Sequence, residues 1–403
     1  MRLLFVSHSL PPDGRPLDNV GGMQRVALKL HESLTHKAAT TDSLTYDALL
    51  LRSAWRTVHV RVPFFLAKAG WKIARAARAG SVDVVLFSSM VTASLAVPLR
   101  KRLRRHGVKT AAIVHGLDVT MPAPPYQWFV PKVFDALDAV LPVSRATRQA
   151  CLDRGAAPSQ LQVVHNGIDV ERFRVPRGRD TDRQSLAERT GFPTPPPPPD
   201  GLLLCSVGRQ VKRKGTAWFV NTVMPRLPDD VHYWIAGDGP QSEAIQDAID
   251  RHDLSPRVRY LGRVSNETLA DLYRGTDLFI MPNIPVEDDM EGFGIVMLEA
   301  GQCGTPAIAA RLEGIPDVIT EGVNGHLVPP QDPDAFVEAI EQYRGNPDAL
   351  VAAARRALQH TKATFGWPAV TDTYLSVLHS LIANGDPAPD EKAPAEATIP
   401  VPG

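Results

Sequence analysis

The chain has 403 residues, of which 44% are hydrophobic and 22% charged, and its formal net charge is zero. This is the composition of an ordinary soluble protein, and the length suggests two or three domains. Three cysteines that lie far apart and lack metal-ligand spacing argue against a disulfide framework and for a reducing, cytoplasmic compartment. The zero charge hides an asymmetry, because residues 1–175 hold 24 Lys and Arg against 12 Asp and Glu, so one half is basic and the other acidic.

The first half alternates short apolar runs with segments of helical pattern. Its apolar N-terminus reads as a first buried strand rather than as a secretion signal, because prolines and an aspartate cut it off at residues 11–13. The most apolar longer run, residues 82–99, is too polar and too short to span a membrane. Alternation of this kind predicts a parallel sheet covered on both faces. The expected strands are 3–7, 82–87, 110–114, 139–143 and 161–164, and the expected helices are 23–34, 68–79 and 145–154.

A second half of the same kind follows a break at residues 172–200. This break holds charged residues and five consecutive prolines, which form an extended, semi-rigid spacer, and we interpret it as a linker. The expected strands beyond it are 202–207, 232–236, 258–261, 278–281, 307–309 and 326–328, with helices such as 266–274 and 334–343 between them, and a last helix at 367–382.

The fold class is therefore α/β, with two Rossmann-like, doubly wound domains facing a cleft. We assign residues 1–171 to the first domain, 201–365 to the second, and 386–403 to a tail whose Pro, Ala and Glu content predicts disorder. Ligands of such sheets bind beyond the carboxyl ends of the strands, so the site is expected in the cleft between the domains.

The stretch EGFGIVMLE at 291–299 joins a glycine-flanked bend to an apolar run with helical character. If a helix starts near Gly294, its first-turn N–H groups form a ready anion site. Those groups belong to Phe293, Gly294, Ile295 and Val296. One carboxylate, Glu291, precedes that site and another, Glu299, lies beyond it, and carboxylates bind hydroxyl pairs well. The arrangement suits a sugar nucleotide, with Glu291 for the sugar and Glu299 for the ribose; the alternative is an ordinary amphipathic helix with two surface glutamates.

A glycine-bounded basic loop, GRQVKRKG at 208–215, follows an expected strand. Arg209 and Lys214 stand five residues apart across it, so both side chains could point at one anion. Charge-assisted contacts of this kind contribute about 1.5–3 kcal/mol each. The alternative is a solvated basic loop.

Three features of the first half would complete a cleft. Gly21 and Gly22 lie in the first connection between a strand and a helix, where they could let a phosphate or sugar approach the backbone or could simply make a turn. His115 ends a strand, three residues before Asp118 on the acceptor side. His115 could donate to a sugar hydroxyl or to a leaving phosphate, or it could be structural. The turn at Asn166 and Gly167 reads as a hinge into the second domain.

Other patterns are excluded or left open. GDGP at 237–240 is not a dinucleotide fingerprint, and the acids at 287–289 read as a solvated turn, so we expect no metal. Four cations recur at helical spacing beside three aromatic residues: Lys68, Lys72, Arg75 and Arg78, near Phe64, Phe65 and Trp71. Together with the cluster at 100–105, they indicate either an anionic membrane contact at the inner face of the cytoplasmic membrane or a solvated basic face. No recognised nucleic-acid fold accompanies the charge, so we expect no nucleic-acid partner.

These motifs resemble those of the retaining glycosyltransferases of family 4, which have the GT-B fold. The resemblance rests on EGFGIVMLE, GRQVKRKG, GDGP, the run at 165–169 and the terminal helix, and it spans nearly the whole chain. The run from Pro282-Asn283 to Gly294 also looks like the branch that contains the phosphatidylinositol mannoside mannosyltransferases. The proline run departs from the usual pattern, in a region away from the site.

The resemblance implies roles by position. Arg209 and Lys214 would bind the donor diphosphate as it leaves, Glu291 would contact the sugar, and Glu299 would hold the ribose. Gly262 and Arg263 would lie near the base, while Gly21, Gly22 and His115 would come from the first domain. The terminal helix within 366–385 would cross back onto that domain. Such enzymes need no metal or other cofactor.

We therefore expect a hexosyltransferase that moves a mannose- or glucose-type sugar from a GDP- or UDP-sugar to a hydroxyl of a glycan or lipid. A GT-B enzyme of another class, such as an epimerase or phosphorylase, is a second reading. A non-catalytic protein that binds sugar nucleotides is a third.

Overall fold

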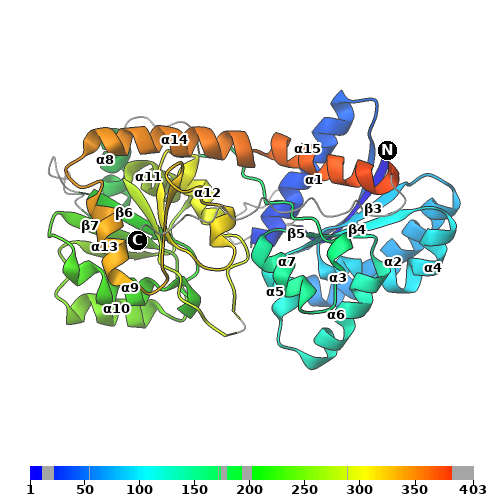
Figure 1. Ribbon diagram of the computed structural model, residues 1–403, viewed down its shortest axis with the longest axis horizontal. Coiled ribbons are helices and arrows are strands. Elements are labelled where there is room, and N and C mark those ends of the chain that lie inside the picture. The colour runs from blue at the N-terminus through cyan, green and yellow to red at the C-terminus, as the bar shows by residue number, and fades with distance from the viewer. Residues whose placement is uncertain are drawn as a thin grey trace, which may run out of the picture.

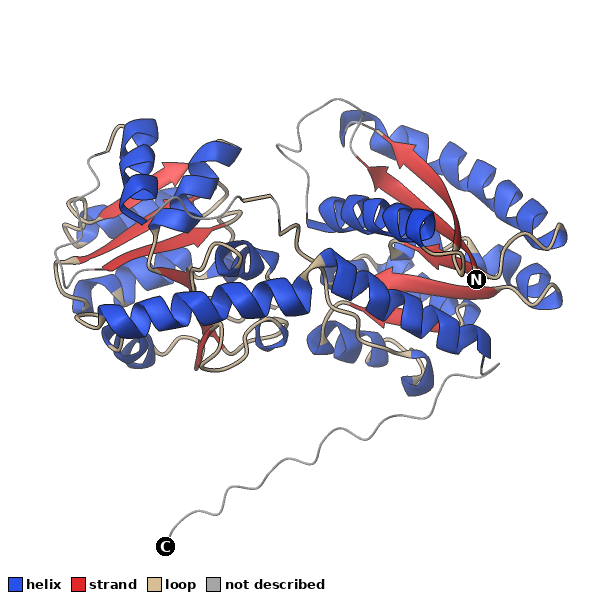
Figure 2. Ribbon diagram, turned by 90° about the horizontal axis from the view of Figure 1, so that it is seen from above, coloured by secondary structure: helices blue, strands red, loops and turns tan. Residues whose placement is uncertain are grey.

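The computed structural model describes residues 1–10, 22–53, 55–170, 172–173, 179–192, 202–287 and 289–383. Gly21, the proline run and the tail from residue 386 lie outside these ranges. Two parallel sheets, each with helices on both of its faces, make two lobes that lie side by side (Figures 1 and 2). This arrangement confirms the expected α/β architecture of two doubly wound domains.

Five parallel strands form the first sheet, in the order β2-β1-β3-β4-β5. They are β1 (Arg2–Leu10), β2 (Thr45–Arg52), β3 (Val84–Phe87), β4 (Lys109–Val114) and β5 (Ala139–Pro142). The inner strands are apolar on both sides because both faces are covered. One face packs against α1 (Gly22–Thr40) and α15 (Trp367–Ala383); the other packs against α2 (Trp55–Arg78), α3 (Met90–Ala93), α4 (Ala96–Arg105) and α6 (Pro124–Ala136).

The second sheet has six parallel strands in the order β11-β10-β9-β6-β7-β8. They are β6 (Leu202–Val207), β7 (Val231–Ala236), β8 (Val258–Gly262), β9 (Leu278–Met281), β10 (Ala307–Ala310) and β11 (Gly325–Val328). Its helices are α9 (Thr216–Thr222), α10 (Ser242–Arg251), α11 (Asn266–Gly275), α12 (Ile295–Gly301), α13 (Pro333–Glu341) and α14 (Pro347–Phe365). The chain order reverses between β6 and β9, and such a switch point is where an open parallel sheet binds ligands.

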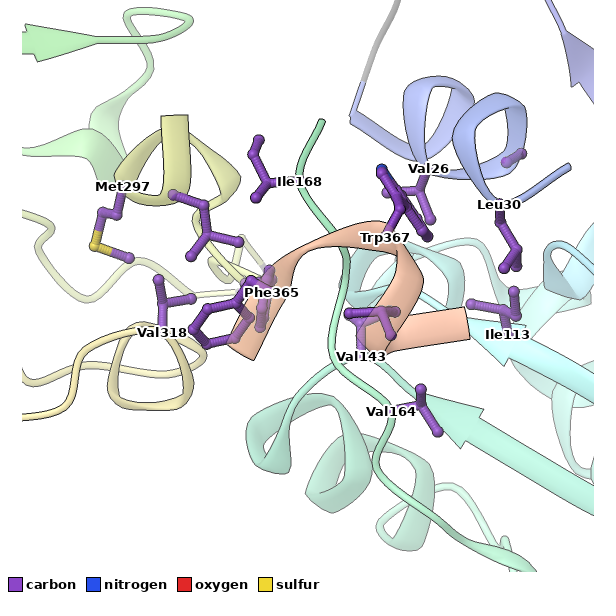
Figure 3. Close-up of a cluster of buried hydrophobic side chains, with 14 of the residues drawn as sticks. Val26, Leu30, Ile113, Val143, Val164, Ile168, Met297, Val318, Phe365 and Trp367 are labelled. Carbon is purple, nitrogen blue, oxygen red and sulfur yellow. The ribbon is translucent and has the colours of Figure 1, made fainter. Parts of the chain in front are cut away.

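The two domains are joined by chain segments that cross side by side. The backbone N–H of Ile168 donates to the Phe365 carbonyl at 2.7 Å as the chain leaves the first domain and later returns. A Cβ on Gly167 would lie 2.6 Å from the Trp367 ring, so glycine is needed for this close approach. Figure 3 shows Phe365 and Trp367 on either side of the crossing, among side chains from both domains. The helix α15 then packs on α1, so the terminal helix does return to the first domain.

Several segments differ from expectation. Helix α2 begins at Trp55, well before the helix expected at 68–79. The expected strand at 161–164 is an isolated bridge from Leu161 to Val140, because the sheet ends at β5. The strand β2 was not anticipated, because its apolar run at 48–51 is short and is flanked by Asp47 and Arg52. Within the expected linker, α8 (Arg179–Thr190) packs on α11, and Arg183 reaches Asp277 at 2.6 Å. This charged helix is stabilised by ion pairs to the second domain, which a local pattern does not display.

Candidate active site

Three loops at the carboxyl ends of neighbouring strands pack closely at the switch point of the second sheet. In the loop after β6, Gly215 has φ 67° and a Cβ there would lie 1.9 Å from the Pro282 carbonyl oxygen, at the end of β9. After β7, a Cβ on Gly237 would lie 2.0 Å from the carbonyl oxygen of Gly208. The glycines of GRQVKRKG and GDGP therefore serve loop-to-loop contact, which brings the basic loop against the segment that leads to Glu291.

The centre of this arrangement is an ion pair between two expected site residues. Lys214 Nζ lies 2.5 Å from Glu291 Oε2, and both side chains are nearly buried. Arg213 Nε lies 3.6 Å from the same oxygen, and the Asn283 amide donates to it at 3.4 Å. The backbone N–H of Glu291 also donates to the carboxylate of Glu313. The loop after β6 and the loop after β9 are thus joined through one carboxylate.

Charge decides the ionisation of Glu291. Burial alone would raise the pKa of its carboxyl group, but the positive charges of Lys214 and Arg213, together with hydrogen bonds, outweigh that effect. Hydrogen bonds from Lys214 and Asn283 act in the same direction, and the pKa lies below its ordinary value. Glu291 is therefore an anionic hydrogen-bond acceptor at neutral pH.

Arg209, the other basic residue of this loop that was expected in the site, has an exposed side chain. Its guanidinium makes no hydrogen bond or ion pair with any residue in the described ranges. Arg213 of the same loop instead forms an ion pair with Asp289, with its Nη1 at 2.9 Å from Oδ1. Asp289 belongs to the acidic loop and is therefore an ion-pair partner rather than a purely solvated turn residue. Asp288 lies outside the described residues.

The helix after the bend starts next to Gly294, as expected. Gly294 is its N-cap, with φ 76° in the left-handed region, and α12 begins at Ile295. Phe293 is buried, and its ring stacks on the His165 ring at 5.5 Å between centroids. Phe293 can thus offer a ligand only its backbone. Ile295 and Val296 are partly exposed at the start of the helix.

Glu299 sits in a charged cluster that spans both domains. Its carboxylate accepts a hydrogen bond from Tyr273 Oη at 3.0 Å and pairs with Arg25 Nη1 at 3.2 Å. Arg172, just after the hinge, also pairs with it. These arginines line a cavity of about 300 Å³ together with Glu299 and Ile295. Neither Arg25 nor Arg172 was singled out from the sequence. The only signal for Arg25 is its place near Gly21 and Gly22.

The first domain meets the EGFG bend directly. A Cβ on Gly116 would lie 3.2 Å from the Cα of Gly292, so glycines on both sides let the two backbones touch. His115, the residue before Gly116, is thereby placed beside the bend. It is buried, and burial lowers its pKa to about 4, so the imidazole is neutral at pH 7. A neutral imidazole still carries one N–H donor.

Asp118 serves first as a helix cap. Its carboxylate accepts from the His115 backbone N–H at 3.3 Å at the start of α5 (Gly116–Thr120). Burial raises the pKa of its carboxyl group to about 7, although backbone hydrogen bonds from His115 and Met90 act to lower it. The expected acceptor-side position is thus a buried group that supports His115.

The remaining expected residues lie outside the Lys214–Glu291 pair and the cluster around Glu299. Arg263 Nε lies 2.7 Å from Asp238 Oδ2, and both side chains are exposed. Gly262 has φ 61° at the end of β8. Gly22 begins α1, where a Cβ would meet nothing within 4 Å. A further ion pair joins the two domains, since Arg145 at the start of α7 (Arg145–Leu152) lies with its Nε 2.8 Å from Asp317 Oδ1.

No group of three or more His, Cys, Asp or Glu side chains in the described ranges is arranged to hold a metal ion. The same ranges contain no helix that is both long and apolar enough to cross a membrane.

Two family models match the two domains in order. Residues 20–172 match Glycosyltransferase Family 4, and residues 201–359 match Glycosyl transferases group 1. The D-inositol 3-phosphate glycosyltransferase 1 of Catenulispora acidiphila is 29% identical over 308 residues, which are 74% of this chain and 70% of that protein. Further relatives with that activity in their names are matched over 49% to 60% of their length, so the chain spans little more than half of them.

Solved structures share the fold at low identity. HepE of Anabaena, solved with UDP, aligns with a TM-score of 0.67 and 17% identity over 94% of this chain and all of that one. Sucrose-phosphate synthase of Thermosynechococcus elongatus aligns with a TM-score of 0.70 and 20% identity over 95% and 99%. Since both family models match and both sheets have the arrangement of these structures, the chain belongs to the family 4 (group 1) glycosyltransferases and has the GT-B fold.

Proposed function

We propose that this glycosyltransferase retains the anomeric configuration of its donor and moves a mannose- or glucose-type hexose from a GDP- or UDP-sugar to an acceptor hydroxyl. The observation that carries the proposal is the pair of Lys214 and Glu291 at the switch point, with the exposed Arg209 on the same loop. A cation for the leaving diphosphate and an anionic acceptor for the sugar hydroxyls are thus held in one place.

The proposed chemistry breaks the bond between the sugar C1 and the diphosphate oxygen through an oxocarbenium-like state. Negative charge grows on the leaving diphosphate, where Arg209 and Lys214 stabilise it as it develops. The acceptor oxygen forms its bond to C1 on the same face, and its proton passes to the leaving phosphate oxygen. Neutral His115 donates its N–H to a sugar hydroxyl across the cleft. No metal is required, because the cations of the loop supply the positive charge.

Glu299 is proposed to hold the ribose, with the base near Gly262 and Arg263. A carboxylate has about four acceptor positions, and Tyr273, Arg25 and Arg172 already use part of them. Ribose hydroxyls would therefore share this carboxylate with the arginines or displace one of them. The cavity of about 300 Å³ beside Glu299 supports a nucleoside in this position.

The acceptor is proposed to be a glycan, a lipid or a phosphorylated polyol with a free hydroxyl. The inositol 3-phosphate in the name of the relatives makes that compound the first acceptor to test. An epimerase or phosphorylase activity has less support, because the named relatives are glycosyltransferases.

The donor can be tested by thermal stabilisation with UDP, GDP and ADP, alone and as sugar conjugates, on the wild type and on Arg209→Ala. A ligand at one hundred times its dissociation constant should add about 2.7 kcal/mol of stability. A shift with one nucleotide that the variant loses names the donor class. No shift with any of them would contradict the proposed diphosphate site.

The reaction is then tested by NMR of the product formed from that donor and each acceptor. Release of nucleoside diphosphate matched by an acceptor glycoside of the donor's anomeric configuration supports retention. An inverted product would overturn the proposed mechanism. Conversion of the donor into a different nucleotide sugar without any acceptor would favour an epimerase.

A further inference from the structure

The helix α2 has an apolar ridge that no described residue covers. Its inner side packs on the first sheet through buried residues such as Ala69, Ile73 and Ala77. On the outer side, Val60, Phe64 and Trp71 are 69%, 77% and 61% exposed. Their spacing of four and seven residues places them on one stripe of the helix. The helix thus presents apolar surface on two sides, and the core accounts for only one.

Cations without acids flank this ridge. The 24 residues of α2 include six Lys and Arg and no Asp or Glu, and the ten residues of α4 include five and none. On the exposed side of α2, Lys68 and Lys72 have no hydrogen-bond or ion-pair partner among the described residues. Arg75 lies over the Trp71 ring at 5.6 Å from its centroid. The charge is therefore not balanced within the fold.

The same face of the domain continues onto two neighbouring helices. Helix α2 contacts α4, and α4 contacts α6, on the side of the sheet away from α1 and α15 (Figure 1). On α6, Trp128 is 69% exposed, and Lys132 Nζ lies over its ring at 2.9 Å from the centroid. We call the outer surface of α2, α4 and α6 the basic face.

Exposed apolar side chains gather on or beside this face rather than being scattered. Val60, Phe64 and Trp71 lie on α2, Trp128 lies on α6, and Met121 lies between α5 and α6. The other large hydrophobic side chains that are exposed in the described ranges lie singly on α1, α14 and α15. An exposed apolar stripe such as Val60, Phe64 and Trp71 on one helix marks an interaction site, whereas single residues do not.

We propose that the basic face docks onto an anionic membrane surface. Lysines and arginines near such a surface are each attracted by its negative potential, and a tryptophan or phenylalanine ring favours the boundary between headgroups and acyl chains. Both components are present side by side on α2, where Lys68 and Lys72 have no hydrogen-bond or ion-pair partner among the described residues. A nucleic acid would account for the cations, but it gives no role to the ridge of Val60 and Phe64.

The direction of α2 relates this surface to the cleft. Strand β2 ends at Arg52, on the edge of the sheet that faces the second domain, so α2 begins at that edge and runs away from it. Val60 and Phe64 are consequently at the end of the ridge nearer the cleft. Docking through the basic face would hold the mouth of the cleft close to the membrane. This inference is independent of the proposed reaction, since it concerns residues outside the active site.

Flotation of the full chain with vesicles tests the proposal. We compare vesicles of phosphatidylcholine alone with vesicles that also contain phosphatidylglycerol. Binding is expected only with the anionic lipid and should weaken as salt is raised. Neutralising Lys68, Lys72 and Arg75 to glutamine should weaken partition by about fivefold per cation, on the order of a hundredfold together. Phe64→Ala and Trp71→Ala should each weaken it roughly tenfold, because each removes a buried ring.

Matched controls lie on α14, where Arg355, Lys362 and Val351 are exposed. Arg355→Gln with Lys362→Gln, and Val351→Ala, should leave vesicle binding unchanged. Absence of binding to anionic vesicles at low salt would overturn the proposal. So would binding that the α2 variants and the α14 variants reduce equally. Binding that is lost with the charges but untouched by Phe64→Ala and Trp71→Ala, with equal adsorption to RNA, would identify a non-specific polyanion surface instead.

Discussion

Lys214 Nζ lies 2.5 Å from Glu291 Oε2, and this contact joins the loops after β6 and β9 where the strand order of the second sheet reverses. The pair fixes the position of the cation and keeps Glu291 charged in a buried setting. Each partner therefore depends on the other, and loss of either is expected to affect both charge stabilisation and the ionisation of the site.

Lys214→Ala should lower kcat by about 100- to 1,000-fold, because a donor aimed at the developing charge of the diphosphate is lost. Without the charge of Lys214, less counteracts the effect of burial on Glu291, so the pKa of Glu291 should rise. The acidic limb of the pH–rate profile should then move to higher pH. Steady-state kinetics across pH measure both effects.

The matched control is Lys212→Ala, an exposed lysine of the same loop, which should keep nearly wild-type turnover. If Lys214→Ala retained most of its kcat while the control behaved as expected, the diphosphate would have to bind elsewhere.

Glu299→Gln should reduce the free energy of unfolding by about 3 kcal/mol even without nucleotide, because it leaves Arg25 and Arg172 without their shared counter-charge. Urea denaturation at constant m-value measures this. Glu243→Gln, an exposed carboxylate on α10, should change stability little.

The same variant should lose most of its thermal shift with the preferred nucleotide. A full shift in Glu299→Gln would mean that the carboxylate is only an interdomain clasp and that the ribose is held by other groups.

The sequence was sufficient for the architecture and for the centre of the site. The apolar runs located the strands of the second domain within two residues. The basic loop and the glycine-flanked bend indicated Lys214 and Glu291, and these two side chains are in contact. These signals are local: a buried strand is a continuous apolar run, and a bend needs glycine.

What the sequence did not predict depends on contacts between distant segments. Arg25 and Arg172 lie 274 and 127 residues from Glu299, and no periodicity relates them to it. Gly292 belongs to the glycine-flanked bend, and it faces Gly116 across the two domains, which the local pattern does not predict. The cap formed by Asp118 is local, but its burial, and so its raised pKa, follows from packing of the whole domain.

Gly116→Val should separate the two domains at the bend, because the added atoms would meet the Gly292 backbone, where a Cβ alone already lies 3.2 Å from Cα. Nucleotide binding, which uses mainly the second domain, should be retained, while kcat should fall by at least about tenfold, since closure excludes water and completes the site. Calorimetric titration with nucleotide, alongside turnover, separates the two effects.

Gly70→Ala is the control for substitution of a glycine. It lies within α2, where a Cβ would be in ordinary contact with Leu95 at 3.5 Å, and alanine favours a helix. Equal loss of nucleotide affinity and kcat in Gly116→Val would point to general unfolding rather than to blocked closure.

Asp118→Asn tests the buried carboxyl group of the first domain. Burial raises the pKa of Asp118 from its ordinary 3.8 to about 7, so between these values the folded state binds more protons than the unfolded state. The contribution of Asp118 to stability therefore falls as pH rises through this window, by about 1.4 kcal/mol per pH unit. Asparagine does not titrate, and its carbonyl oxygen can still accept from the His115 N–H.

Urea denaturation at pH 5 and pH 8 should then show that the wild type loses up to about 3 kcal/mol more than Asp118→Asn between the two conditions. Asp135→Asn, which removes an exposed carboxylate on α6, should follow the wild type at both values. Parallel pH dependence in the wild type and Asp118→Asn would mean that the Asp118 carboxylate is ionised in the fold at pH 5. In that case its backbone donors, His115 and Met90, would outweigh its burial, and a charged group would stand directly behind the imidazole of the cleft.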